Sequence, residues 1–400
     1  MTGRVRRIAP LGMKGLLALF FFFAVAAGAS AGTVRGTGDL GIVIERASGR
    51  VVIVEHSHRS RIGAVDGLGD LSHASAVFSR DGRYAFVFGR DGGLSKIDLI
   101  EAKLVRRIVQ AGNAIGGAIS ADGRLIAVSN YEPGGVKIFD AESLDLVADL
   151  PAESNGQRSK VVGLVETADG AFVYTLYDAG EIWVADVAEP VRPAIRKFTG
   201  IGALPYDGVI VDGGRSYVAG LFGEDGLALL DLWQPEAGVR RVLSGYGRGE
   251  EPLPVYKMPH LEGVAVAGGN VFLPAVGRHE LLVADVRTWA EVARIPVHGQ
   301  PVFAVARPDG RQVWVNFAHP RNDTVQVIDV PSLSVAHTLR PGKAVMHLEF
   351  TPKADQVWIS ARDEDLVRIY DPRTLAELGA IAAEKPSGIF FTARANRLGY

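Results

Sequence analysis

One short phrase returns with variations along most of this 400-residue chain. Each copy has a turn pair such as Asp81-Gly82, then an apolar run, and then a second apolar run that ends in Asp, as at Asp98. Seven internal copies are present, with turn pairs that begin at Asp81, Asp122, Asp169, Gly213, Gly268, Asp309 and Ala354. Successive turns lie roughly 41 to 55 residues apart, and a period of this size with four short apolar runs is typical of a β-propeller blade.

The chemistry of the phrase explains its geometry. Asp-Gly pairs tolerate the positive φ of a tight hairpin turn, and runs rich in Val, Ile, Phe and Tyr favour strands. The closing Asp can accept hydrogen bonds from the backbone of the turn that follows it. Because one blade cannot bury both of its faces alone, successive blades must stack around a shared core. The chain is therefore predicted to be all-β.

The two ends of the chain supply the pieces of one further blade. Residues 40–44 and 51–54 have the composition of strands near the N-terminus, and residues 388–391 have it near the C-terminus. Joining them in one sheet closes the ring and leaves fewer exposed strand edges. We predict an eight-bladed β-propeller, and seven blades are the alternative.

Composition supports a single turn-rich domain. The chain has 48 Gly and 20 Pro, with no low-complexity tract and no heptad run. The repeat extends over nearly all of it, so we predict one domain over residues 32–400. The net charge of −2 gives no case for nucleic-acid binding. H-E-x-x-H and Walker sequences are absent, which excludes the metalloprotease and nucleotide sites that depend on them.

The N-terminus has the pattern of an export signal. Basic residues precede an apolar run at residues 16–25, and Ala29-Ser30-Ala31 forms an A-x-A cleavage site. We predict a signal peptide over residues 1–31 and a mature protein in the periplasm; an uncleaved anchor is the alternative. Arg6-Arg7 leaves both the general secretory and the twin-arginine route open. The chain has no Cys, which excludes disulfides, an acyl anchor on Cys and a covalent c-type haem.

Five of the nine histidines fall on one predicted face of the ring. In a propeller, the loops that enter the innermost strands share a face with the loops that join the second and third strands, and the Asp-Gly turns occupy the other face. The histidines placed on the first face are His73, His260, His279, His319 and His347. The same loops carry Arg90, Asn130, Tyr131, Arg158, Lys160 and Arg362.

The residue types on this face fit one class of ligand. Imidazoles bind transition metals and haem iron, and they can move protons near neutral pH. Arg and Lys bind carboxylates. A funnel with imidazoles inside and cations around it therefore predicts a flat, iron-bearing tetrapyrrole with several carboxylates. For any single residue, the alternative is an ordinary rim position, where a His is capped and an Arg is only solvated.

Two segments resemble a known family. Residues 71–92 are similar to the haem-ligand segment in the d1-haem propeller of cytochrome cd1 nitrite reductases, and residues 385–391 are similar to that domain's closing segment. The resemblance covers essentially the whole predicted mature chain. Because the chain has neither the c-type haem domain of the reductases nor any Cys, the resemblance implies a protein of haem d1 biosynthesis and not a nitrite reductase.

The resemblance also implies roles for single residues. His73 stands where the family has its axial iron ligand, so it is the predicted metal ligand. His260 and His319 stand where the reductases have two histidines on the distal side of the iron. His347 has no clear counterpart there, and with His260 and His319 it completes the predicted acid/base groups. The other predicted cofactor contacts are Arg90, Arg158 and Lys160, which resemble carboxylate clamps, together with Asn130, Tyr131 and Arg362.

We therefore expect a periplasmic protein of denitrification that binds haem d1, or a dihydro-haem d1 precursor, non-covalently and acts in its final maturation. Two hypotheses stay open: an enzyme that modifies a substituent of the tetrapyrrole, and a carrier that holds haem d1 and delivers it to nitrite reductase. Nitrite reductase and other haem d1 assembly proteins are the expected partners. A peptide-binding scaffold is a third class, and it predicts no binding of a tetrapyrrole.

Overall fold

The computed structural model describes Gly3 and residues 36–247, 263–275 and 277–395. All described secondary structure belongs to one compact unit, residues 36–400. Apart from Gly3, the predicted signal peptide lies outside the described residues. In the part of the chain that is described, no helix has the length and apolarity needed to cross a membrane.

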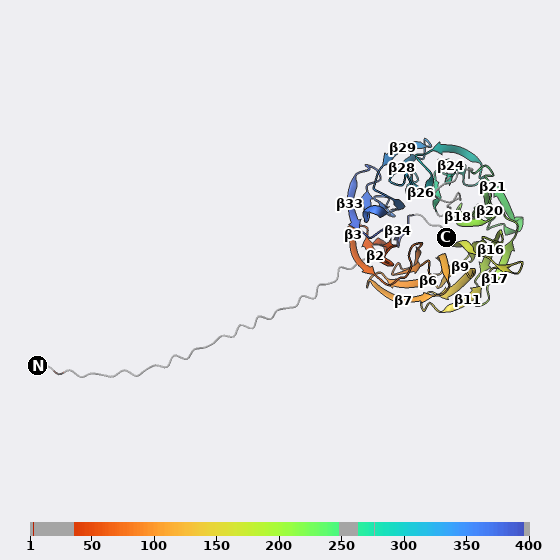
Figure 1. The fold of residues 1–400 in the computed structure, drawn as a ribbon, viewed down its shortest axis with the longest axis horizontal. Coiled ribbons are helices and arrows are strands. Elements are labelled where there is room, and N and C mark those ends of the chain that lie inside the picture. Colours follow the sequence, from red (N-terminus) through yellow and green to blue (C-terminus); the bar gives the residue numbers. More distant parts are fainter. Residues whose placement is uncertain (1–2, 4–35, 248–262, 276, 396–400) are drawn as a thin grey trace. The chain divides into compact units, whose positions relative to one another are not determined.

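Eight four-stranded antiparallel sheets, the blades, follow one another around a ring in the described chain (Figure 1). We name the strands of each blade from the innermost to the outermost. Blade 1 has β4 (Ser75–Phe78), β5 (Tyr84–Phe88), β6 (Gly93–Asp98) and β7 (Lys103–Val109). Blade 2 has β8 (Asn113–Ile119), β9 (Leu125–Glu132), β10 (Gly135–Asp140) and β11 (Leu146–Leu150). Blade 3 has β14 (Val161–Glu166), β15 (Phe172–Leu176), β16 (Glu181–Asp186) and β17 (Ala194–Phe198). Blade 4 has β18 (Pro205–Val211), β19 (Ser216–Leu221), β20 (Leu227–Asp231) and β21 (Val239–Val242).

The second half of the ring repeats this plan. Blade 5 has β22 (Ala265–Ala267), β23 (Asn270–Ala275), β24 (Glu280–Asp285) and β25 (Glu291–Pro296). Blade 6 has β26 (Pro301–Ala306), β27 (Gln312–Phe317), β28 (Val325–Asp329) and β29 (Ser334–Leu339). Blade 7 has β30 (Val345–Phe350), β31 (Val357–Ala361), β32 (Leu366–Tyr370) and β33 (Glu377–Ala382). Blade 8 has β34 (Pro386–Phe391), β1 (Leu40–Glu45), β2 (Arg50–Glu55) and β3 (Ser60–Val65). The remaining elements are the hairpin of β12 (Glu153–Ser154) and β13 (Gln157–Arg158) and the short 3-10 segments η1 (Thr37–Asp39), η2 (Pro235–Ala237) and η4 (Arg362–Glu364).

Blade 8 joins the two ends of the chain. Its innermost strand, β34, pairs antiparallel with β1, and Ile42 faces Phe390 in the register. In Figure 1 the orange strands β2 and β3 accordingly lie beside the blue end of the chain. The predicted eight-bladed, all-β propeller with one split blade is confirmed, and the seven-bladed alternative is wrong. This pairing covers the edge of β1 and links the two ends of the chain within one sheet.

The repeated phrase folds as its chemistry predicts. In blade 1, Gly82 adopts a positive φ of 68°, and the carboxylate of Asp81 accepts a hydrogen bond from the backbone N–H of Arg83 at 3.0 Å. The closing Asp98 accepts one from the backbone N–H of Ile100, also at 3.0 Å. Both turns are thus held by side-chain bonds made within a few residues, which is why such turns can be recognised in the sequence.

The apolar core lies between neighbouring blades. Phe86 and Phe88 of blade 1 pack with Ile119 and Ile126 of blade 2, and all four side chains are buried. Gly117 makes this approach possible, because a Cβ there would meet the Phe88 ring at 2.4 Å. Burying such a side chain stabilises the fold by about 1.5–3 kcal/mol, so the stacked blades form a rigid wall around the axis.

Candidate functional site

A cavity of about 600 Å³ lies where the blades converge. Its walls come from the innermost strands β4, β8, β14, β18, β26, β30 and β34. At one end, which we call the funnel face, Ser72, His73 and Tyr206 line it. At the other end, the turn face, Arg80, Thr392 and Arg394 line it. A cavity of this size can enclose a drug-sized or larger ligand.

His73 lies at the funnel-face end of the cavity. It precedes β4, is exposed to solvent and lines the cavity wall. The loop that carries it is fixed by Asp70, whose carboxylate accepts a hydrogen bond of 2.8 Å from the backbone N–H of Ser72. The imidazole is therefore presented to the cavity from a constrained turn, as a metal ligand must be.

Three arginines gather near His73. Arg46, Arg90 and Arg362 come from the loops between the second and third strands of blades 8, 1 and 7, which are consecutive around the ring. Arg46 lines the cavity and donates a hydrogen bond to the backbone carbonyl of Ser72. Burial lowers the pKa of Arg46, and the charges of Arg362 and Arg90 lower it further, against the opposing effect of Asp70. This end of the cavity thus concentrates positive charge that an anionic ligand can neutralise.

Sequence reasoning selected Arg90 and Arg362 but missed Arg46. Arg46 follows β1 directly, just as Arg362 follows β31, so the two arginines hold equivalent positions in neighbouring blades. The signal was available in the repeat. Because blade 8 is split between the chain ends, its first loop resembles the others only when β34 is added.

Arg158 and Lys160 lie near the β12–β13 hairpin, and neither lines the cavity. Arg158 is exposed and pairs with Glu153 at 3.4 Å. Nζ of Lys160 stands 3.1 Å from the Asp178 carboxylate. Both cations therefore have acidic partners already, and a ligand carboxylate must compete with these partners.

Asn130 and Tyr131 differ in what they reach. Asn130 is buried, and its side-chain oxygen accepts a hydrogen bond of 2.8 Å from Gln110, which links the segment between blades 1 and 2 to β9. The hydroxyl of Tyr131 bonds with that of Tyr206, which lines the cavity. Burial raises the pKa of Tyr131 to about 12, so its hydroxyl keeps its proton at neutral pH.

Aromatic side chains gather around Tyr206. Its ring packs against Tyr177 at 6.0 Å and against Phe222 at 6.3 Å between ring centroids. Tyr206 and Phe222 belong to blade 4, which is four blades away from blade 8 in a ring of eight. The funnel face thus has cations on one side and aromatic rings on the side across from them.

His347 lies on β30 and lines the cavity. Its Nδ1 accepts a hydrogen bond from the backbone N–H of Ile389 at 3.2 Å, and its ring packs on Phe390 with the centroids 5.5 Å apart. Burial lowers the pKa of His347 to about 3, with a smaller effect from the charge of Arg394. The imidazole is therefore neutral throughout the physiological range.

The other two predicted acid/base histidines are placed differently. His319 is exposed in the loop after β27 and does not line the cavity. His260 lies outside the described residues. Of the predicted site, the structure thus brings His73 and His347 to the cavity wall, with Arg90 and Arg362 near the cavity-lining Arg46 and Tyr131 bonded to the cavity-lining Tyr206.

Comparison with known proteins places this propeller in a family. The Cytochrome D1 heme domain family matches residues 35–395. The chain belongs to this family. The match spans all eight blades, and it confirms the resemblance that residues 71–92 and 385–391 indicated.

Relatives of the Cytochrome D1 heme domain family match the chain along its length. Protein NirF of Stutzerimonas stutzeri and Protein NirF of Pseudomonas aeruginosa are each 56% identical over 369 residues, which is 92% of this chain and 94% of each relative. The dihydro-heme d1 dehydrogenase of Pseudomonas aeruginosa is 30% identical over 90% of this chain and 72% of its own length.

Solved structures agree with the family. Dihydro-heme d1 dehydrogenase NirN in complex with DHE is similar with a TM-score of 0.78 and 27% identity, covering 89% of this chain and 76% of that chain. Apo AztD from Citrobacter koseri has a TM-score of 0.61 at 13% identity, covering 88% of this chain and 96% of that chain, and this likeness shows the fold alone.

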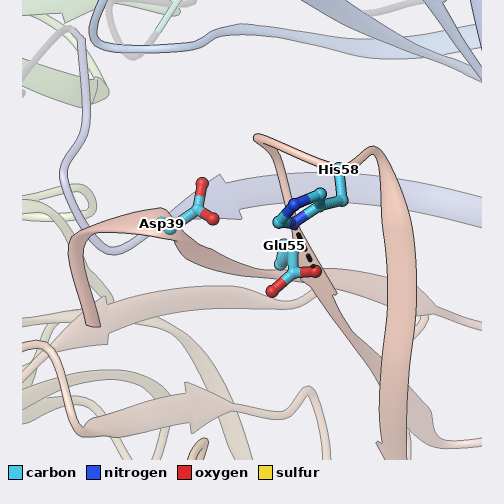
Figure 2. Close-up of side chains that lie close together, drawn as sticks. All are labelled: Asp39, Glu55 and His58. Atoms are coloured by element: carbon cyan, nitrogen blue, oxygen red, sulfur yellow. Dashed lines mark hydrogen bonds and ion pairs between the residues drawn. The ribbon is translucent and has the colours of Figure 1, made fainter. Parts of the chain in front are cut away.

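One further polar cluster is formed by residues that do not line the central cavity. Figure 2 shows Asp39, Glu55 and His58 close together on blade 8, and possible metal-ligand atoms of the three lie within 4.8 Å of one another. Nδ1 of His58 stands 2.9 Å from Glu55, and Asp39 accepts a hydrogen bond from the backbone N–H of Ser57. These bonds tie the β2–β3 turn to the start of β1, so we assign the cluster a structural role.

Proposed function

We propose that the protein binds haem d1, or a dihydro-haem d1 precursor, non-covalently in the central cavity and acts in haem d1 biosynthesis. The observation that carries the proposal is the placement of His73 and three arginines at one end of the cavity in a member of the Cytochrome D1 heme domain family. The names of its relatives, Protein NirF and dihydro-heme d1 dehydrogenase, support it.

The residues of the cavity fit an iron tetrapyrrole. His73 can supply a nitrogen ligand to iron, and bound iron would supply Lewis-acid and redox chemistry. Arg46, Arg90 and Arg362 can hold carboxylates, and for Arg46 the crowding of like charges makes an anionic partner favourable. Apolar walls such as Phe303 and Phe390 can cover the faces of a flat macrocycle and exclude water.

We further propose that the protein acts in the final maturation of the cofactor in the periplasm. The predicted export signal at residues 1–31 supports this location. As an enzyme, it would modify a substituent or the oxidation state of the tetrapyrrole. Of the three candidate histidines, His347 is the one that lines the cavity among the described residues, and its neutral imidazole can hydrogen-bond a substituent there.

A carrier is the second candidate, and two observations favour it. The chain has no Cys to hold a covalent c-type haem, so an electron relay of that kind is not built in. His73 is also exposed at the funnel face, where a partner protein such as nitrite reductase or another haem d1 assembly protein could receive the ligand.

Two measurements on the purified protein test these proposals. Titration with haem d1 should give a saturable change in the visible spectrum, and a spectrum identical to that of free haem d1 would refute the binding site and favour a peptide-binding scaffold. Incubation with a dihydro-haem d1 precursor, followed by mass spectrometry, then separates the two candidates. A change in mass supports the enzyme, and an unchanged mass with tight binding supports the carrier.

A further inference from the structure

Glu349 and Arg394 form an ion pair at the turn-face end of the central cavity. Glu349 lies on β30 of blade 7, and Arg394 follows β34 of blade 8 by three residues. Oε2 of Glu349 stands 3.6 Å from Nη2 of Arg394, which is longer than a well-formed charged hydrogen bond. Arg394 lines the cavity, whereas Glu349 is buried at 3% exposure.

This pair leaves hydrogen-bonding capacity unused. Among the described residues, Oε1 of Glu349 and Nε of Arg394 are both buried without a hydrogen-bond partner. A buried carboxylate with an unsatisfied oxygen is costly, and protonation removes much of that cost. Burial accordingly raises the pKa of Glu349 to about 7, against the opposing effect of Arg394. Glu349 therefore gains and loses its proton near neutral pH.

Three elements surround Glu349. β30 itself contributes His347, which is neutral because burial lowers its pKa to about 3. The segment after β34 contributes Arg394, and β31 contributes Trp358, which faces Glu349 in the strand register and carries no charge. Arg394 is thus the charged group that decides the protonation state of Glu349.

We propose that Arg394 binds a carboxylate of the cavity's ligand in exchange for Glu349, so that ligand binding is coupled to proton uptake by Glu349. The proposal rests on the proposed function, since it takes the ligand to be a carboxylated tetrapyrrole. Without ligand, the guanidinium pairs with the Glu349 carboxylate. With ligand, the guanidinium turns to the ligand's carboxylate, and Glu349 takes one proton from solvent to become a neutral acid. The Glu349–Arg394 pair is neutral before the exchange, and Arg394, neutral Glu349 and the ligand's carboxylate together are neutral after it.

The loose geometry makes this exchange favourable. Arg394 gives up a partner at 3.6 Å and gains one that can meet its donors at an ordinary hydrogen-bond distance. Glu349 then needs no counter-charge, because a neutral buried acid is tolerated far better than a buried anion. A carboxylate site at the turn-face end also complements the three arginines at the funnel face, so the two ends can hold carboxylates on different edges of one ligand.

Proton uptake is the direct readout. Calorimetric titration of the protein with haem d1 in buffers of different ionisation enthalpy gives the number of protons taken up. The wild type should take up more protons than Glu349→Gln at pH 7, and the difference should grow at pH 8, because Glu349 is increasingly ionised before binding. Glu181→Gln is the matched control: this glutamate is also buried but bonds to Ser154 and Trp183 away from the cavity, so the variant should match the wild type.

A second arm removes the carboxylates from the ligand. The methyl ester of haem d1 cannot replace Glu349, so its binding to the wild type should lack the extra proton uptake. The preference for the free acid over the ester should fall roughly 10- to 100-fold in Arg394→Ala, since one charged hydrogen-bonded contact is lost. Arg124→Ala, which removes an exposed arginine paired with Asp122, should leave that preference unchanged.

The outcomes separate this inference from the proposed function. If neither haem d1 nor its ester binds the wild type, the proposed function is wrong. If haem d1 binds but the wild type and Glu349→Gln take up equal numbers of protons at pH 8, the carboxylate exchange is wrong and the binding site stands. The ester arm uses the wild-type protein and decides the matter even if Glu349→Gln does not fold.

Discussion

The imidazole Nδ1 of His347 accepts a hydrogen bond from the backbone N–H of Ile389, 3.2 Å away. A neutral imidazole with an accepting Nδ1 must carry its proton on Nε2. The innermost strands of blades 7 and 8 thus set the tautomer of a histidine that lines the cavity. What His347 can offer to a ligand is therefore an N–H donor, and the blade contact keeps it so.

His347 should make stability depend on pH in a defined direction. Its pKa in the folded protein is about 3, below the ordinary value of 6.5. Between pH 6.5 and 3 this histidine is protonated in the unfolded chain but stays neutral in the folded protein. The wild type therefore loses stability as the pH falls through this window. His347→Asn keeps an acceptor but does not titrate, and urea unfolding from pH 7 to 4 should show a smaller loss of stability in this variant. His337→Asn, at an exposed position on β29, is the control and should follow the wild type.

His73→Ala should change the visible spectrum of bound haem d1. An axial imidazole tunes the electronic state of haem iron, and its removal should shift the Soret region. Because His73 is exposed in a loop, folding should be little affected, as circular dichroism can verify. A spectrum equal to that of the wild type would reassign His73 to an ordinary rim position. His337→Ala controls for the loss of a surface imidazole.

Arg46 and Arg90, near His73, should carry more binding energy than the cations paired with neighbouring carboxylates. Arg46→Ala and Arg90→Ala should each weaken haem d1 binding roughly 10- to 100-fold, with an affinity that falls as salt is added. Arg362→Ala, Arg158→Ala and Lys160→Ala should have smaller effects, because Asp363, Glu153 and Asp178 compete for these three charges. Equal effects in all five variants would show that pairing at the rim does not matter.

Replacing the candidate acid/base histidines separates the enzyme from the carrier. If the protein is an enzyme, His347→Ala should block haem d1 maturation in cells while the affinity for haem d1 stays nearly unchanged. His260→Ala and His319→Ala test the other two candidates in the same assay. If the protein is a carrier, each substitution should act only through affinity or transfer rate. Normal maturation in the triple variant would end the case for these histidines as acid/base groups.

Closure of the ring should depend on packing at β34. Phe391 is fully buried, and its ring packs on Trp358 and His56 with 5.3 Å between centroids in each pair. Phe391→Ala should lower the free energy of unfolding by about 3–5 kcal/mol, because it leaves a cavity at the joint of blades 7 and 8. Urea denaturation measures this change. Leu378→Ala, which truncates a partly exposed side chain on β33, should cost much less.

The number and kind of blades could be predicted because their signals are local. The Asp of an Asp-Gly pair and the closing Asp98 accept hydrogen bonds from backbone N–H groups within a few residues. A short stretch of sequence is therefore enough to predict such a turn. Counting these hairpins and noting unpaired strands at both chain ends was sufficient to predict eight blades and the β34–β1 joint. The loops that carry His73, Arg90 and Arg362 followed from the same repeat.

The composition of the cavity wall was decided by tertiary structure. Arg46 and Arg362 are 316 positions apart in the sequence, and they became neighbours only when the last strand closed the ring. Asn130 is buried and bonded to Gln110, and the sequence could not show this, because which side of a strand faces the axis depends on the packing of the next blade. The pair of Glu349 and Arg394 has no local signal at all: its chemistry comes from burial between two blades, and burial is a property of the assembled ring.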